Sequence, residues 1–196
     1  MNIICFRHGE SVGNKKDITQ GHIDYKLTKK GKKQAKELND SLNNREIAVD
    51  KIYSSDLTRA LETAKIAFPE KDIIKDTRLR EQNYGEIEGG KLDDFIANNP
   101  EYSRDNREAF ELNVPDGECI KDVENRVKSA FYDFVESHND TDTICISCHY
   151  TPMMVLLSIA KEHDLYDIWF SESIDNCEVL HLEYSESTRI IDRYNS

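Results

Sequence analysis

Three stretches of this sequence place a histidine or an arginine just after a short apolar run. Arg7-His8-Gly9-Glu10 follows Asn2–Phe6, and His149 follows Thr143–Ser147. Between them, Arg59 comes shortly after the run Lys51–Ser54. An imidazole changes its charge near neutral pH, and a guanidinium offers an anion a fixed fork of donors. These residues could therefore form an active site that handles an anion, if the fold brings them together.

The stretch around His149 also allows interpretations that involve a metal. Cys145-x-x-Cys148-His149 matches the pattern of covalent haem attachment, and cysteine and histidine are zinc ligands. On a strand, however, an offset of three points the two thiols to opposite faces. No second Cys/His pair supplies the remaining ligands of a zinc site. We therefore expect neither a metal nor a haem, and we expect the five cysteines to be buried, reduced thiols.

The apolar runs predict strands that alternate with helices. The expected strands are Asn2–Phe6, Lys51–Ser54, Asp72–Ile74, Thr143–Ser147, Glu178–Tyr184 and Thr188–Tyr194. The expected helices begin after caps at Thr28 and at Ser55 or Asp56, and two more cover Glu118–Glu136 and Pro152–Glu162. This order predicts an α/β fold, a three-layer α/β/α sandwich around a mostly parallel central sheet with room for antiparallel edge strands.

Such a sheet binds its ligands beyond the carboxyl ends of its strands. One histidine after a strand is usually an ordinary loop residue. Here Arg7, His8, Arg59 and His149 all follow strand ends, so the predicted topology gathers them at one edge of the sheet. Four such groups at equivalent positions indicate a shared site.

The chain length of 196 residues predicts a single domain over residues 1–196. Residues 85–117 are irregular in pattern, with several glycines, two prolines and mixed charge. We interpret this segment as an insertion over the active site.

Composition limits the possible partners. The formal net charge is −12, from 38 acidic and 26 basic residues, which argues against nucleic-acid binding. No apolar run is long enough to span a bilayer, and no signal peptide is visible, so we expect no membrane association and a cytoplasmic location. An anionic substrate would have to be captured by a local group of arginines.

Taken in chain order, the motifs resemble those of the histidine phosphatase superfamily, in its phosphoglycerate-mutase-like branch with the RHG motif. Arg7-His8-Gly9-Glu10 resembles the family signature, and residues 53–64 (YSSDLTRALETA) are similar to its second motif. Leu79-Arg80-Glu81 resembles the segment that carries the acid, and His149 falls where the second histidine belongs. The resemblance covers nearly the whole chain and implies a phosphoglycerate-mutase-like fold.

The resemblance implies catalytic roles. His8 would be the nucleophile that forms a phosphohistidine, and Glu81 would give a proton to the leaving oxygen. Arg7, Arg59 and His149 would bind the phosphoryl group, with a protonated His149 as a third cationic donor. Two further positions match phosphate-contacting residues of the family, Asn14 and Ser11.

The expected rim of the substrate site consists of Gln20, Gly21, Tyr84 and Tyr150. Tyr150 is a departure, because the family usually has a glycine directly after the second histidine. The sequence therefore does not name the substrate, although a small phosphorylated metabolite is expected. It leaves the oligomeric state open.

The expected activity is metal-independent hydrolysis of phosphomonoesters through phospho-His8, without a cofactor. One alternative is a phosphoglycerate-type phosphomutase that uses the same phosphoenzyme. A second is a non-catalytic phosphate-binding module, which the retention of His8, Arg59, Glu81 and His149 disfavours.

Overall fold

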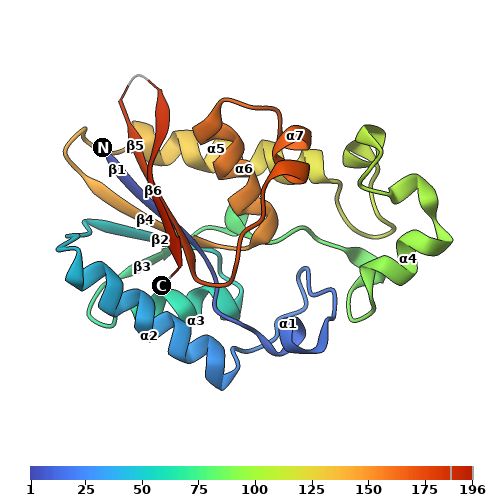
Figure 1. Ribbon diagram of the computed structural model, residues 1–196, viewed down its shortest axis with the longest axis horizontal. Coiled ribbons are helices and arrows are strands. Elements are labelled where there is room, and N and C mark those ends of the chain that lie inside the picture. The colour runs from blue at the N-terminus through green and yellow to red at the C-terminus, as the bar shows by residue number, and fades with distance from the viewer. Residues whose placement is uncertain (186, 196) are drawn as a thin grey trace.

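The computed structural model describes residues 1–185 and 187–195, and a mixed six-stranded sheet runs through this part of the chain (Figure 1). The strands are β1 (Asn2–Arg7), β2 (Lys51–Ser54), β3 (Ile73–Lys75), β4 (Thr143–Cys148), β5 (Glu178–Tyr184) and β6 (Thr188–Asn195). Their order across the sheet is β3-β2-β4-β1-β5-β6. The first four strands in this order are parallel, whereas β5 and β6 each pair antiparallel to their neighbour. The predicted sheet is confirmed, and each strand boundary lies within one residue of its prediction.

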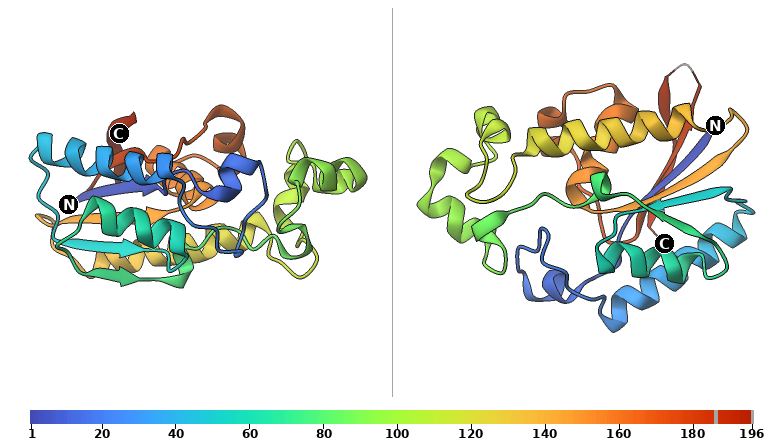
Figure 2. Two further views of the ribbon diagram at one scale, coloured as in Figure 1. Left: turned by 90° about the horizontal axis from the view of Figure 1, so that it is seen from below. Right: turned by 180° about the vertical axis from the view of Figure 1, so that it is seen from behind.

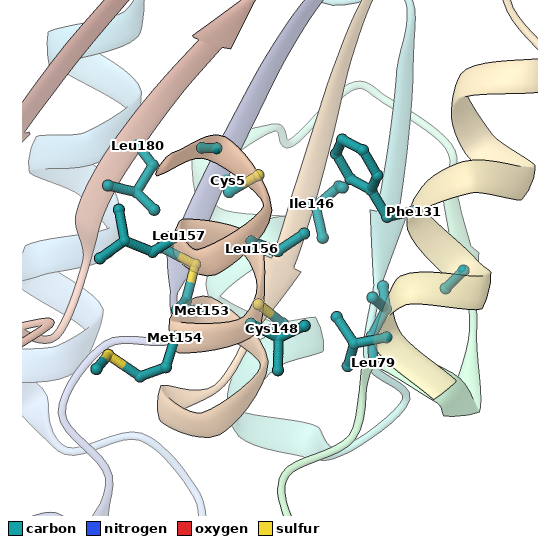
Figure 3. Packing of buried hydrophobic residues seen from close by; sticks show 14 of the residues in the cluster. Cys5, Leu79, Phe131, Ile146, Cys148, Met153, Met154, Leu156, Leu157 and Leu180 are labelled. Atoms are coloured by element: carbon teal, nitrogen blue, oxygen red, sulfur yellow. The ribbon is translucent and has the colours of Figure 1, made fainter. Parts of the chain in front are cut away.

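Helices cover both faces of the sheet, as the alternating pattern predicts (Figures 1 and 2). Helices α2 (Lys29–Asn44) and α3 (Thr58–Ala67) lie on one face, and α5 (Ile120–Glu136) and α6 (Tyr150–Lys161) lie on the other. Side chains along β1 alternate between the two layers: Ile4 packs with the first pair of helices and Ile3 with the second. Figure 3 shows part of the second layer, where Met153 of α6 and Phe131 of α5 meet the sheet.

The same alternation separates the two cysteines of the Cys-x-x-Cys-His stretch. Cys145 belongs to the apolar layer under α2 and α3, and Cys148 to the layer under α5 and α6. Both thiols are fully buried, and burial raises the pKa of each. They cannot bind one metal or haem together, as their spacing on a strand predicts.

One of the two predicted helix caps is correct. The Thr28 hydroxyl accepts a hydrogen bond from the Gly31 N–H at 3.0 Å and caps α2. The prediction for α3 is wrong, because its N-cap is Leu57, which makes no side-chain capping bond. The carboxylate of Asp24, from a distant loop, accepts from the Thr58 N–H at 2.8 Å instead. The Ser55 hydroxyl bonds the buried His149 and accepts from the N–H of Leu57 at 3.3 Å, so it reaches the N-cap residue itself and not the first turn of α3.

The segment between β3 and α5 extends from one end of the molecule, beyond the carboxyl ends of the parallel strands (Figure 2). It contains short helices only: η1 (Thr77–Leu79), η2 (Gly85–Ile87), α4 (Leu92–Asn98), η3 (Pro100–Tyr102) and η4 (Arg107–Glu111). The remaining helices are α1 (Val12–Lys16), near the same end, and α7 (Leu165–Ser171). Within residues 1–185 and 187–195, the helices fall short of the length and apolarity needed to cross a bilayer.

Candidate active site

The loop that carries Arg7 and His8 leaves β1 and is held from three sides. The His8 N–H donates to the carbonyl of Cys148 at 3.0 Å, and the Asn176 amide donates to the carbonyl of His8 at 2.9 Å. The Gly9 N–H donates to the Thr63 hydroxyl on α3 at 3.0 Å. A side chain at Gly9 would place its Cβ 2.5 Å from the Gly31 carbonyl oxygen, so this position requires glycine. The loop is therefore a rigid platform for His8.

The His8 side chain is set up as a neutral base with one free nitrogen. Its Nδ1 lies 2.7 Å from the carbonyl of Gly9, which can only accept, so Nδ1 carries the proton and Nε2 keeps its lone pair. Burial lowers the pKa of this imidazole well below 6.5, and the charges of Arg59 and Arg7 lower it further. His8 is thus uncharged at neutral pH.

Arg59 supplies buried positive charge beside His8. Its side chain is 1% exposed, and it donates to the carbonyls of Gly21 at 2.7 Å and Ile23 at 3.1 Å. The Glu88 carboxylate holds the same loop, because it accepts from the N–H groups of His22 at 2.6 Å and Ile23 at 2.7 Å. The loop and Glu88 therefore orient the guanidinium.

Arg7 is the second guanidinium, and it also has donors left over. It donates to the carbonyl of Ile174 at 2.7 Å. The buried Nε atoms of Arg7 and Arg59 have no hydrogen-bond partner among the described residues. Two oriented guanidinium groups that flank a neutral imidazole form a site for a dianionic tetrahedral group.

His149 lies behind His8 rather than on the cavity surface. Its ring centroid is 5.1 Å from that of His8, its side chain is 0% exposed, and its Nε2 forms a 2.8 Å hydrogen bond with the Ser55 hydroxyl. Burial, followed by the charge of Arg59, lowers the pKa of His149 well below 6.5. The expected protonated His149 is therefore not the form that the unliganded site favours, because its surroundings are already positive.

Glu81 is held at the N-terminus of α6. Its carboxylate accepts from the N–H groups of Tyr150 at 3.0 Å, Thr151 at 3.2 Å and Gln82 at 2.9 Å. The side chain is 9% exposed and lines the same cavity as His8. The chain therefore brings a carboxyl group to the cavity that His8 occupies.

A clamp from α5 fixes the backbone around Glu81. Arg126 donates to the carbonyls of Arg78 at 2.7 Å, Arg80 at 2.6 Å and Glu81 at 2.9 Å. Its other side bonds the Glu118 carboxylate at 2.7 and 3.1 Å. Sequence reasoning missed this pair. The only signal is that the two residues lie eight apart, and nothing in that spacing indicates that they hold residues 78–81.

The cavity has a volume of about 260 Å³, and most of the predicted site residues line it. Those that line it are Arg7, His8, Asn14, Gln20, Gly21, Arg59, Glu81, Tyr84 and Tyr150. Ser11 is not among them: it is fully buried, caps α1, and its hydroxyl donates to Gln20 at 2.6 Å. Sequence reasoning also did not single out the polar residues Asp17, Thr19, Lys91 and Asp93, which line the cavity as well.

This arrangement joins a neutral imidazole with a free nitrogen lone pair, two guanidinium groups and a carboxyl group in one cavity. A phosphomonoester suits it, because its phosphoryl oxygens can take the arginine donors while phosphorus faces the imidazole.

Comparison with known proteins agrees with this geometry. The chain matches the model of the histidine phosphatase superfamily (branch 1) over residues 3–196, and it belongs to that superfamily. It is 32% identical over 188 residues to phosphoserine phosphatase 1 of Hydrogenobacter thermophilus, covering 93% of this chain and 87% of the relative. It is 29% identical over 187 residues to a 2,3-bisphosphoglycerate-dependent phosphoglycerate mutase of Staphylococcus epidermidis, covering 79% and 82%.

A solved structure confirms the predicted fold. YhfR of Bacillus stearothermophilus superposes with a TM-score of 0.84 at 29% identity, over 97% of this chain and 95% of that one. The relatives are phosphatases and phosphomutases, so membership of the superfamily supports an enzyme that transfers phosphoryl groups.

Proposed function

We propose that this protein hydrolyses phosphomonoesters through a phosphohistidine formed on His8. The observation that carries the proposal is the neutral His8 imidazole, locked by the carbonyl of Gly9 and flanked by Arg7 and Arg59. Because the Gly9 bond occupies Nδ1, Nε2 is the attacking atom.

In the first step, the Nε2 lone pair of His8 attacks phosphorus and the bond from phosphorus to the ester oxygen breaks. The leaving alkoxide takes a proton from Glu81 and departs as an alcohol. Arg7, Arg59 and Asn14 bind the phosphoryl oxygens, and the two arginines offset their charge without a metal.

The second step returns the enzyme to its starting state. Water attacks phosphorus, Glu81 takes a proton from this water, and the bond between phosphorus and Nε2 breaks to release inorganic phosphate. His149 supports both steps from behind His8. The Nδ1 of His149 has no hydrogen-bond partner among the described residues, and with the charge of a bound phosphoryl group this favours uptake of a proton there only when substrate is present.

The test is phosphate release from a panel of phosphomonoesters in the presence of EDTA. Wild type should release phosphate, and His8→Ala should lose at least about a thousandfold of kcat, because the nucleophile is gone. His163→Ala is the matched control, since His163 is exposed and does not line the cavity. Release that persists in His8→Ala would refute the assignment of the nucleophile.

A phosphomutase is the second candidate, and the 29% identity to the staphylococcal mutase favours keeping it. A mutase would pass the phosphoryl group from phospho-His8 to an acceptor alcohol instead of to water. The test is isomerisation of a phosphoglycerate in the presence of a bisphosphate primer. If isomerisation is faster than phosphate release, the proposed activity is that of a mutase and not that of a phosphatase. Phosphate binding without either reaction would indicate a non-catalytic module.

A further inference from the structure

Tyr150, the residue after His149, lines the cavity. Building on the phosphomonoesterase activity proposed above, we propose that Tyr150 is a specificity-determining residue that limits substrates to phosphomonoesters of compact, polar alcohols. The proposal stands on how the Tyr150 ring is held, on the residues that support it, and on the polar residues that also line the cavity.

The Tyr150 ring contacts a cation and an aromatic side chain. The Arg7 guanidinium carbon lies 5.2 Å from its centroid, within the range of a cation–π contact. The Trp169 ring of α7 meets it in a T-shaped contact at 5.6 Å and 80°. Trp169 is 9% exposed, so a turn of the Tyr150 ring would cost its contact with a buried side chain. These two contacts hold the ring as a wall of the cavity.

The same wall continues into the segment over the cavity. The Arg104 guanidinium carbon lies 4.5 Å from the centroid of Trp169, and Arg104 donates to the Tyr84 hydroxyl at 2.8 Å. Tyr84 is 8% exposed and lines the cavity beside Tyr150. We call Tyr150, Trp169, Arg104 and Tyr84 the aromatic wall. It joins α6 and α7 to residues 84–104, so both tyrosines that face the substrate are supported from behind.

Tyr84, one member of the aromatic wall, separates the cavity from further space. Behind Tyr84 lies a small apolar hollow of about 20 Å³, and Tyr84 and Leu92 line both spaces. The active-site cavity, at about 260 Å³, lies below the ~300–1,000 Å³ typical of sites for drug-sized ligands. Because the phosphoryl group must occupy the end next to His8, only part of this volume is left for the leaving group.

One side of the cavity is polar. Its ionised or hydrogen-bonding residues are Asp17, Thr19, Gln20, Lys91 and Asp93. Lys91 and Asp17 form an ion pair at 3.3 Å, so both signs of charge are available there. A leaving alcohol with hydroxyl, amino or carboxylate groups would find partners on this side, whereas an apolar one would leave these groups without them.

The size limit is tested with phenyl phosphate and 1-naphthyl phosphate, because their leaving groups differ mainly in size. Wild type should prefer the phenyl ester. In Tyr150→Ala the ratio of kcat/KM for naphthyl over phenyl should rise about tenfold or more, and Tyr150→Phe should keep the wild-type ratio because the ring remains. Arg104→Gln should shift the ratio in the same direction, and it covers the case in which Tyr150→Ala fails to fold.

The control for the size test is Tyr132→Ala on α5, where the side chain is 46% exposed and outside the cavity. It should leave the ratio unchanged. A variant that only destabilises the fold would lower kcat/KM for both esters equally and leave the ratio unchanged. An unchanged ratio in both Tyr150→Ala and Arg104→Gln would therefore overturn the specificity proposal. It would leave the phosphatase assignment in place. Equal use of both esters by wild type would overturn it too.

The polarity of the leaving group is tested with glycerol 3-phosphate and propyl phosphate, which share a three-carbon chain. Wild type should favour glycerol 3-phosphate about tenfold, and a preference for propyl phosphate would contradict the proposal. If wild type releases phosphate from none of these esters, the proposed function fails and the specificity proposal fails with it.

Discussion

Arg126 on α5 donates to the main-chain carbonyl of Glu81 at 2.9 Å, although the two residues are 45 positions apart in the chain. The same guanidinium bonds two more carbonyls of the segment before Glu81 and is held in turn by Glu118. Arg126 itself does not line the cavity. It is therefore a positioning residue: it sets where the Glu81 carboxyl lies relative to the leaving oxygen.

Loss of this clamp should imitate loss of the proton donor. Arg126→Gln and Glu81→Gln should both lower kcat for alkyl phosphates by a factor on the order of 10². Both should lower kcat for p-nitrophenyl phosphate much less, because nitrophenolate leaves without a proton. The measurement is kcat for both esters in each variant. Arg78→Gln, whose side chain bonds Asp76 and Asp133 instead, is the control and should keep the wild-type ratio. If Arg126→Gln lowers kcat equally for both esters, Arg126 stabilises the fold and does not position Glu81.

Ser55→Ala should affect both stability and turnover. The buried hydroxyl is the partner of His149 Nε2 at 2.8 Å, and Nδ1 of the same ring has no partner among the described residues. Removing the hydroxyl leaves a fully buried imidazole without hydrogen bonds, which should cost about 1–3 kcal/mol in the free energy of unfolding. Urea unfolding measures this cost, and kcat should fall because His149 contacts His8.

The control for this change is Ser158→Ala on α6, where a buried hydroxyl donates to the carbonyl of Val155 in the same helix. It should lower stability less and leave kcat unchanged. If Ser158→Ala reduced kcat as much as Ser55→Ala, the link between Ser55 and the histidine pair would be wrong.

The protein should lose stability below about pH 6.5. Burial lowers the pKa of His8 and of His149 in the folded state, so the unfolded chain binds more protons than the folded chain once pH falls below 6.5. Stability is then greatest above that pH, and each histidine removes up to about 1.4 kcal/mol per pH unit below it. Urea unfolding at pH 7.5 and 5.5 measures the loss. His149→Gln should show a smaller loss than wild type, and identical losses would contradict the assignment.

Gly9→Ala should disrupt the platform of the nucleophile. Its Cβ would lie 2.5 Å from the Gly31 carbonyl oxygen, which is backbone at the start of α2 and cannot move aside alone. We expect a loss of about 1–3 kcal/mol from overpacking and a fall in kcat, since the loop carries His8. Gly90→Ala, where the nearest atom is 3.3 Å from the added Cβ, is the milder control. Equal kcat in Gly9→Ala and wild type would refute the inference that the loop around Gly9 fixes the position of His8.

The local pattern of apolar residues in the sequence determined the central sheet of this protein and the residues at its edge. Short apolar runs predict strands, and parallel strands end at one edge, so the sequence alone places Arg7, His8 and Arg59 near one another. It also places Cys145 and Cys148 on opposite faces of a strand, because side chains alternate there. These features follow from periods of a few residues, which a single sequence displays.

Tertiary structure decided which of these residues line the cavity and what supports them. Ser11 and His149 are not among its lining residues, and Asp24 replaces the expected local cap of α3. The Arg126 clamp and the aromatic wall join residues from elements far apart in the chain. No sequence period connects such residues. Their contacts arise because buried polar groups need partners and each takes the donor or acceptor that packing brings within about 3 Å.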